Sequence, residues 1–126
     1  MAVRGIGIDV CKVERISESL RRFGERMEKR LFTPGELAYC RAFKDPLPHL
    51  AARFAAKEAT SKALGTGIAG GVGWTQIEVV QPGGRVPELR LSGAALERFT
   101  SLGATRSHLT LSHDAGLGLA CVVLEG

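Results

Sequence analysis

Residues Ala52 to Gly67 read ARFAAKEATSKALGTG, and they decide the fold because they predict a long alanine-rich helix with a defined end. Alanines fill one side of this helix when it is wound at about 100° per residue. The polar side chains of Arg53, Lys57, Thr60 and Ser61 gather on another side as an expected polar face.

Glu58 and Lys62 fall outside that polar face, at about 140° and about 180° from Arg53. They lie beside Ala51 and Phe54, where a helix that packs on a core is expected to be apolar. One interpretation is an ordinary i,i+4 ion pair that stabilises the helix by about 0.2–0.5 kcal/mol. The other is that both side chains reach into a cleft, where a carboxylate holds a cation and an ammonium group holds a phosphate.

The residues after this helix favour the cleft. Gly65 suits the left-handed position at a helix end, and a run of small residues from Thr66 to Gly73 follows it. A glycine-rich turn allows backbone N–H groups to approach an anion, although a flexible surface loop has the same composition. The order of residues required for a nucleotide P-loop is absent.

The amino-terminal segment Val3 to Val10 alternates with the period of a half-buried strand. Ile6, Ile8 and Val10 point one way, while two glycines and Asp9 point the other way. Because glycines permit the close approach of a backbone or a ligand, Asp9 is a candidate to seat a cation. It is equally suited to cap the next helix, and one carboxylate can do both.

The remaining chain predicts further helices and strands around these two segments. They are a helix from Val13, a helix opened by the capping box Thr33–Glu36 and running to about Phe43, strands at Trp74–Val80 and Glu88–Leu91, a helix at Ala94–Leu102, and strands near Ser107–Ser112 and Leu117–Leu124. This order indicates a single α+β domain over residues 1–126, with an antiparallel β-sheet and the long α-helix packed across it.

His113 continues the face of Leu109 and Leu111 at the end of one predicted strand. A hydrogen-bonded structural role and a ligand-binding role are both compatible with a lone histidine in this place.

Composition limits the class of protein. With 126 residues, 44% hydrophobic and 24% charged, the chain has enough apolar residues for one core. No apolar run approaches the roughly 18 residues of a membrane span and no signal-peptide pattern is present, so a cytoplasmic protein without membrane contact is expected. Cys11, Cys40 and Cys121 are scattered, which predicts unpaired thiols in a reducing compartment and no zinc site.

The formal net charge of +4 favours an acidic partner or a phosphate-bearing ligand. Much of the excess lies in one early segment that contains Lys12, Arg15, Arg21, Arg22, Arg26, Lys29 and Arg30, diluted by four glutamates. This segment is either a solvated helix face or a docking surface.

Several spaced blocks together resemble the holo-[acyl-carrier-protein] synthases, a group of 4′-phosphopantetheinyl transferases. The blocks are Gly5–Asp9, Phe32–Glu36, Arg53–Ala59, Lys62–Gly67, Trp74 with Ile77–Glu78, and Leu111–Asp114, and they span nearly the whole chain. The segment Ala38–Leu50 matches nothing specific in the pattern. The resemblance implies a 4′-phosphopantetheinyl transferase fold. It also implies transfer of the phosphopantetheine arm of coenzyme A to a serine of apo acyl carrier protein, with release of adenosine 3′,5′-bisphosphate.

The resemblance further implies Mg²⁺ as cofactor, coenzyme A as co-substrate, an acidic carrier protein as partner, and a homotrimer with active sites between subunits. By motif position, Asp9 and Glu58 are the expected metal ligands, and with Lys62 the catalytic residues. Glu58, directly or through a metal-held water, is the candidate to accept the serine proton. The expected coenzyme A site is lined by Lys62, Gly65, Thr66, Gly67, His113 and Arg53. The expected carrier-protein surface contains Arg15, Arg21 and Arg22.

Two other functions use the same features. A small magnesium-dependent nucleotide hydrolase would use the same carboxylates and lysine, with water as the attacking group instead of a serine hydroxyl. A basic nucleic-acid-binding module fits the charge, but one tryptophan, one tyrosine and no basic stretch interleaved with aromatic residues argue against it.

Overall fold

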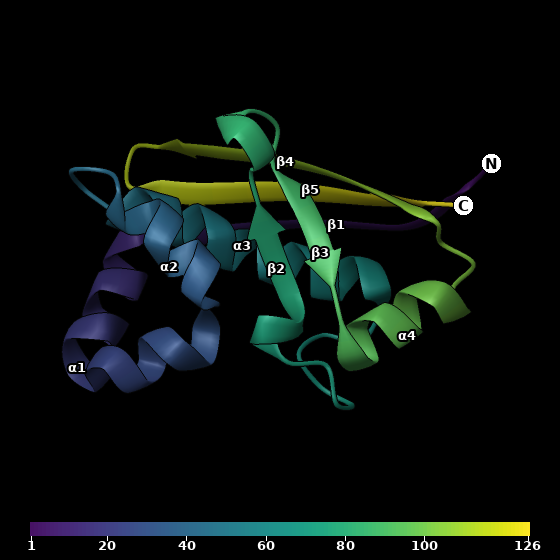
Figure 1. Ribbon diagram of the computed structural model, residues 1–126, viewed down its shortest axis with the longest axis horizontal. Helices are drawn as coiled ribbons and strands as arrows, with labels where there is room; N and C mark the ends of the chain where they lie inside the picture. The colour runs from purple at the N-terminus through teal and green to yellow at the C-terminus, as the bar shows by residue number, and fades with distance from the viewer.

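The computed structural model describes all 126 residues and shows one long helix laid along a three-stranded sheet (Figure 1). The elements in chain order are β1 (Val3–Lys12), α1 (Val13–Leu31), α2 (Pro34–Arg41), α3 (Leu47–Leu64), β2 (Ile77–Val80), β3 (Glu88–Leu91), α4 (Gly93–Ser101), β4 (Arg106–Asp114) and β5 (Leu117–Glu125). In Figure 1, α1 and α2 lie at one end of α3, and α4 lies at the other end with both chain termini.

The strands form two antiparallel sheets. One has the order β1-β5-β4, and the other is the β2-β3 hairpin. In the first sheet, Ile8 is opposite Cys121, which is opposite Thr110 in turn. The predicted α+β class with a helix across an antiparallel sheet is confirmed, although the strands do not form a single sheet.

The two glycines of β1 allow α3 to lie directly on the sheet. A Cβ atom at Gly5 would overlap the carbonyl oxygen of Ala63, and one at Gly7 would overlap that of Ala59. Gly118 of β5 meets the backbone of Ala52 in the same way. The small residues of helix and strand therefore match each other, and this match places α3 against β1 along its length.

The opposite face of β1 is not packed on the core. Ile6 is 67% exposed and Ile8 is 66% exposed, whereas Gly7 and Cys11 on the other face are buried. The half-buried strand was predicted correctly, but its apolar side chains face outward and its glycine face is the buried one. An apolar patch thus remains uncovered on β1.

Helix α3 corrects the predicted assignment of polar and apolar faces. The expected polar face is buried: Arg53 is 2% exposed, and Lys57, Thr60 and Ser61 are fully buried. Glu58 is only partly buried and Lys62 is exposed. The reason is that α3 is covered by the sheet, by α1 and α2, and by strand β2. Only a narrow strip beside β1, which contains Glu58 and Lys62, stays accessible.

Some predictions of local structure are confirmed, and others are wrong in part. Thr33 and Glu36 form the predicted capping box, and Gly65 ends α3 with φ 78°. The strand predicted at Trp74–Val80 is wrong in its first part, since Trp74–Gln76 forms a 3₁₀ turn before β2. Helix α1 is interrupted at Gly24, where φ is 62°. None of the helices combines the length and the apolar character needed to cross a membrane.

Candidate functional site

Asp9, Glu58 and Lys62 come together on the accessible strip between β1 and α3. The Nζ atom of Lys62 lies 2.9 Å from Oδ1 of Asp9 and also donates a hydrogen bond to the carbonyl oxygen of Ile8. The side chain of Glu58 makes no ion pair and no hydrogen bond within the chain, so the interpretation of Glu58 and Lys62 as a helix ion pair is wrong. Glu58 is a carboxylate that the fold leaves free.

Glu58 is held in an environment that opposes its negative charge. Burial raises the pKa of the Glu58 carboxyl, and the nearby Asp9 carboxylate raises it further, while Lys62 and Arg15 act in the opposite direction. Two carboxylates thus face one another with only partial compensation by cations. Such a pair is stabilised by an added cation.

This repulsion gives a testable dependence of stability on pH. Because the pKa of Glu58 is higher in the folded than in the unfolded chain, the folded state holds more protons, and its Glu58 contribution to stability is lost as pH rises between the two values. We expect Glu58→Gln to be more stable than the wild type at pH 7 in metal-free buffer, and to lose this advantage near pH 4. Urea unfolding measures the difference, with the exposed Glu97→Gln as control. An equal difference at both pH values would contradict the assignment.

The donor set at this site fits a magnesium ion better than a transition metal. No group of three or more His, Cys, Asp or Glu side chains is arranged so that it could hold a metal ion. Mg²⁺ is commonly held by one or two carboxylates together with substrate phosphates and waters. Asp9 and Glu58 supply the two carboxylates, and the adjacent ammonium group of Lys62 suits a phosphate ligand.

The turn at Gly65–Gly67 lies at the end of the same strip but does not offer free amides. The N–H group of Gly65 donates to the carbonyl of Lys62, and those of Thr66 and Gly67 both donate to the carbonyl of Ser61. These amides close the carboxyl end of α3 instead of pointing free toward an anion, and a role for Gly65, Thr66 and Gly67 in lining the coenzyme A site stays a prediction. The guanidinium of Arg98, which donates to the carbonyl of Leu64, brings a positive charge to this turn that the sequence did not indicate.

His113 lies at the far end of α3, where α3 begins and β4 ends. It lines a pocket of about 510 Å³ together with Asp45, Asp114 and residues of the β4–β5 turn. Its ring meets that of His49 on α3 edge to face, with centroids 5.1 Å apart. Its predicted position in line with Leu109 and Leu111 is confirmed, and the neighbouring imidazole is a feature that the sequence analysis missed.

Arg53, predicted to line the coenzyme A site, is placed inside the protein. Its guanidinium lies 4.1 Å from the ring centroid of Tyr39 and donates a hydrogen bond to Gln81, while Nε has no partner. A role in ligand binding stays a prediction for this residue. In this structure its guanidinium contacts the ring of Tyr39 and the side chain of Gln81.

The predicted docking arginines all lie exposed on the first half of α1. Arg21 is paired with Glu18 at 2.6 Å, whereas Arg15 and Arg22 form no ion pair. Arg15 is close enough to influence Glu58 electrostatically. Arg15 thus lies near the carboxylate site, and of the three predicted docking arginines Arg15 and Arg22 have no ion-pair partner in the chain.

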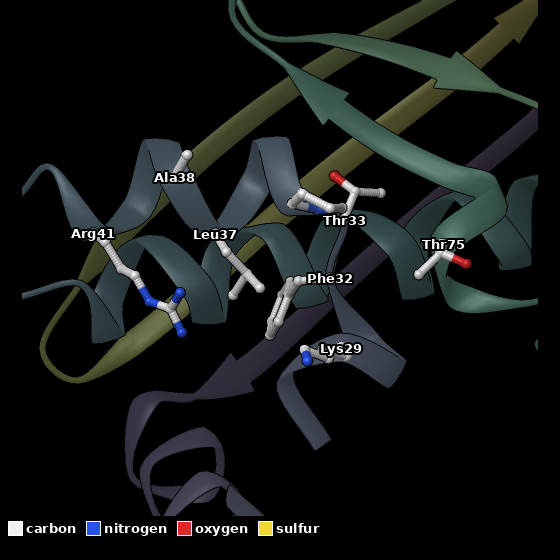
Figure 2. Close-up of a pocket in the computed structure, with 8 residues that line it drawn as sticks. Lys29, Phe32, Thr33, Leu37, Ala38, Arg41 and Thr75 are labelled. Atoms are coloured by element: carbon white, nitrogen blue, oxygen red, sulfur yellow. The ribbon is translucent and has the colours of Figure 1, made fainter. Parts of the chain in front are cut away.

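A separate pocket of about 560 Å³ opens between the end of α1 and α2 (Figure 2). Phe32 and Leu37 form its apolar part, and Lys29 and Arg41 stand at its edge. None of the predicted catalytic or coenzyme-binding residues lines it. The residues predicted to be catalytic therefore lie on the strip beside α3 and not at this pocket.

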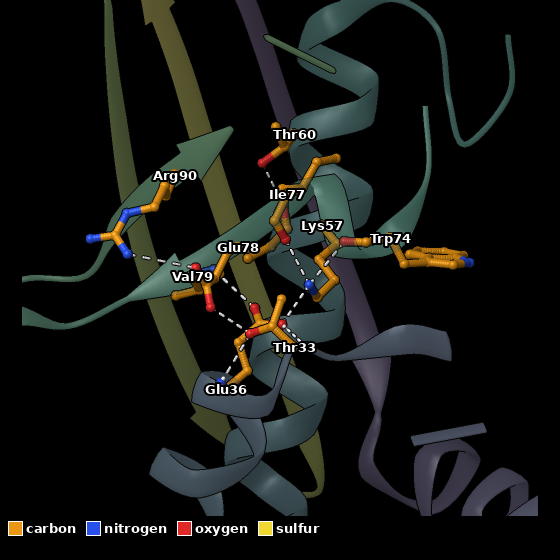
Figure 3. Close-up of polar contacts among 10 residues, drawn as sticks. Thr33, Glu36, Lys57, Thr60, Trp74, Ile77, Glu78, Val79 and Arg90 are labelled. Atoms are coloured by element: carbon orange, nitrogen blue, oxygen red, sulfur yellow. Dashed lines mark hydrogen bonds and ion pairs between the residues drawn. The ribbon is translucent and has the colours of Figure 1, made fainter. Parts of the chain in front are cut away.

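Sequence reasoning also missed a buried ion pair made by Lys57, the residue before Glu58 on α3 (Figure 3). Nζ of Lys57 lies 2.7 Å from Oε1 of Glu36, with both side chains fully buried. Lys57 also donates to the carbonyl oxygens of Trp74 and Ile77, and Glu36 accepts from the amide of Val79. This network ties α2, α3 and β2 together, and it therefore fixes the back of the helix that carries Glu58.

Comparisons with known proteins place these residues in a family context. The family model for the 4′-phosphopantetheinyl transferase superfamily matches residues 5–119. The chain is 45% identical over 124 residues to a holo-[acyl-carrier-protein] synthase of Koribacter versatilis, with 98% of each chain covered.

Solved structures agree with this match. The holo-[acyl-carrier-protein] synthase of Neisseria meningitidis superimposes with a TM-score of 0.88 at 36% identity, covering 99% of this chain and 100% of that one. The corresponding enzyme of Helicobacter pylori, solved in complex with coenzyme A, gives a TM-score of 0.84 at 32% identity, with 95% and 99% covered.

Proposed function

Because the chain belongs to the 4′-phosphopantetheinyl transferase superfamily, and within it to the holo-[acyl-carrier-protein] synthases, we propose that it transfers the 4′-phosphopantetheine group of coenzyme A to a serine hydroxyl of apo acyl carrier protein. Adenosine 3′,5′-bisphosphate is the second product, and the modified carrier protein serves fatty-acid biosynthesis. The observation that carries the proposal is the accessible cluster of Asp9, Glu58 and Lys62, in which one carboxylate has no partner of its own.

Asp9 and Glu58 hold Mg²⁺ in this proposal, and Lys62 binds the diphosphate of coenzyme A. When bound, the cation neutralises charge on the diphosphate and on the departing phosphate. The side chain of Lys62 is 53% exposed. Its ammonium group can therefore turn from Asp9 to a phosphate oxygen while it stays in contact with solvent. There it stabilises the negative charge that grows on the leaving group.

Glu58 is also the candidate to accept the proton of the attacking serine. Its raised pKa means that this carboxylate holds a proton more tightly than an exposed glutamate does. In the free protein Asp9 contributes to that shift and is paired with Lys62. The two carboxylates are therefore unequal. Because a carboxylate that also holds a cation is a weaker base, Glu58 would take up the serine proton through an intervening water.

The acidic carrier protein docks on the exposed face of α1 in this proposal. Arg15 lies beside the carboxylate site, and Arg21 and Arg22 follow about two turns later on the same helix. Positive charge along this path speeds the encounter with an acidic partner and orients it toward Glu58.

Charge reversal at Arg15 tests this surface. We expect Arg15→Glu to raise the Michaelis constant for carrier protein by about tenfold, with little change in that for coenzyme A, and to become less costly at high salt. Steady-state kinetics with each substrate varied in turn measures the effect, and Arg85→Glu on the β2–β3 turn is the matched control. Equal losses for both substrates would count against a docking role.

The chain is proposed to act as a homotrimer with sites between subunits. Ile6, Ile8 and Val10 form an exposed apolar patch on edge strand β1, flanked on β5 by the partly buried Leu119, Cys121 and Val123. An apolar patch of this kind favours a protein interface. Lys62 borders the same patch, since it shares a pocket with Ile6, Ile8 and Cys121. A second subunit on this patch would therefore lie next to the active site.

A charge on this patch is expected to separate the subunits. Ile8→Glu should sediment as a monomer and lose most of its transfer activity, because the site then lacks the surface of the neighbouring subunit. Val86→Glu is the control, since Val86 is equally exposed, at 67%, but lies on the β2–β3 hairpin away from the patch. A monomeric Ile8→Glu variant with full activity would be incompatible with a shared site.

A cytoplasmic location is part of the same proposal. Cys11 and Cys40 are buried, and no disulfide links any of the three cysteines. Burial raises the pKa of both thiols to about 11, so they are present as unreactive thiols at neutral pH. These thiols fit a reducing compartment.

Product analysis separates the proposed transferase from a nucleotide hydrolase. We expect adenosine 3′,5′-bisphosphate to form from coenzyme A only when apo acyl carrier protein is present, and in equal amount to the modified carrier protein. Chromatography of the nucleotides measures both conditions. Release of the same product without carrier protein would instead indicate hydrolysis.

A further inference from the structure

The side chain of Gln76 joins the glycine-rich loop after α3 to the start of α4. Its Nε2 donates a hydrogen bond to the carbonyl oxygen of Gly71 at 2.8 Å, and its Oε1 accepts one from the backbone N–H of Ala95 at 3.0 Å. The orientation of the amide follows from these partners, because a carbonyl can only accept and an N–H can only donate. This place therefore requires a side chain that donates and accepts at once.

The loop, residues 66–73, has few other connections to the chain. Three of its glycines have positive φ, namely Gly67 at 61°, Gly70 at 64° and Gly71 at 89°. Glycine loses more conformational freedom on ordering than any other residue, so such a loop is costly to fix. Val72 is buried and anchors the loop on the core, and its N–H donates locally to Ala69. The bond from Gln76 is the only hydrogen bond that links residues 68–72 to the rest of the chain.

Gln76 also takes the place of a capping residue at the start of α4. Ser92, which precedes this helix, makes no capping hydrogen bond with its own side chain. Gly93 leaves room for the amide, since a Cβ atom there would lie 3.2 Å from Cδ of Gln76. Helix α4 in turn carries Arg98, whose Nε donates to the carbonyl of Leu64 at 2.9 Å. Gln76 thus fixes the loop on one side and, through α4, a cation at the end of α3 on the other.

We propose that Gln76 is a positioning residue for coenzyme A binding: it holds the loop in its binding conformation before coenzyme A arrives. The inference rests on the proposed function, in which the Gly65–Gly67 turn at the beginning of this loop lines the coenzyme A site. A loop that is already ordered loses less conformational entropy on binding, which increases affinity. Because Gln76 has no contact with Asp9, Glu58 or Lys62, it acts on binding and leaves the chemical step unchanged.

Gln76→Glu separates the two contacts of this side chain. A carboxylate still accepts from the N–H of Ala95, and its charge suits the amino-terminal end of α4. It cannot donate to the carbonyl of Gly71, and it repels that oxygen. Gln76→Ala removes both contacts. Hydrogen exchange measured by mass spectrometry should therefore be faster in residues 66–73 for both variants, and faster in α4 for Gln76→Ala alone.

Coenzyme A binding and kinetics of the intact protein give the functional result. We expect Gln76→Glu to raise Kd and KM for coenzyme A by about fivefold, the scale of one lost hydrogen bond. Both kcat and the KM for carrier protein should stay at the wild-type values. Thr75→Glu adds the same charge at the neighbouring exposed position, which makes no contact with the loop, and serves as the control. It should bind coenzyme A as the wild type does.

Several results would overturn the inference. One is a wild-type affinity for coenzyme A in Gln76→Glu, whether or not its loop exchanges faster. Another is a loss of affinity confined to Gln76→Ala, because the effect would then come from α4 and not from the loop. A lower kcat with an unchanged KM would contradict a positioning role. If the wild type bound no coenzyme A, the proposed function would fail together with the inference, whereas tight binding that is indifferent to Gln76→Glu affects the inference alone.

Discussion

Glu58→Ala is expected to remove metal-dependent transfer while the protein stays folded. Removal of a group that holds charge at a reacting centre typically costs about 10²–10³ in rate, and we expect a loss of at least about a hundredfold. The fold should survive because the Glu58 side chain has no hydrogen bond or ion pair within the chain, and because its removal relieves repulsion with Asp9.

Three measurements on Glu58→Ala separate catalysis from folding. Transfer is followed with saturating coenzyme A and carrier protein, Mn²⁺ binding is measured by electron paramagnetic resonance, and stability is measured by urea unfolding. Glu97→Ala on the exposed face of α4 is the matched control. If Glu58→Ala lost its activity through unfolding, or kept its activity with metal still bound, the carboxylate would not have the role given to it here.

Lys57→Met is expected to have the largest effect on stability. Removal of one partner from a buried ion pair costs about 3–5 kcal/mol, because the other charge is left without compensation. Here the carboxylate of Glu36 is fully buried, and the carbonyl oxygens of Trp74 and Ile77 would lose their shared donor as well (Figure 3). Burial lowers the pKa of Lys57, and the adjacent Glu36 opposes this effect.

A double-variant cycle shows whether the pair acts as a unit. Glu36→Gln with Lys57→Met should destabilise the protein by less than the sum of the two single changes, since no buried charge then stands alone. Urea unfolding measures all three variants, and the exposed Lys44→Met provides the surface control. Additive costs below about 1 kcal/mol would show that the network contributes little to stability.

The sequence predicted local features whose cause is local. The capping box at Thr33 and the end of α3 at Gly65 depend on neighbours within a few residues, and both are confirmed. The two glycines of β1 also indicated a close approach, because only a residue without a side chain permits it. What the glycines could not reveal is that the approaching group is the backbone of α3.

The errors concern contacts between distant segments. Helical periodicity treats Lys57 as a surface residue, because its partner Glu36 lies 21 positions earlier and is brought to it only by packing of α2 on α3. In the same way, Lys62 pairs with Asp9 instead of with Glu58 one turn away. The contact between His49 and His113 joins α3 to β4, and no pattern within either segment indicates it.

We propose that this chain moves the phosphopantetheine arm with the help of a cation held by Asp9 and Glu58. The decisive experiment is mass spectrometry of apo acyl carrier protein after incubation with the chain, coenzyme A and Mg²⁺. We expect a gain of one phosphopantetheine group per carrier protein, which disappears with a chelator and returns when Mg²⁺ is restored. An unchanged mass with Mg²⁺, or an equal gain in the presence of the chelator, would contradict it.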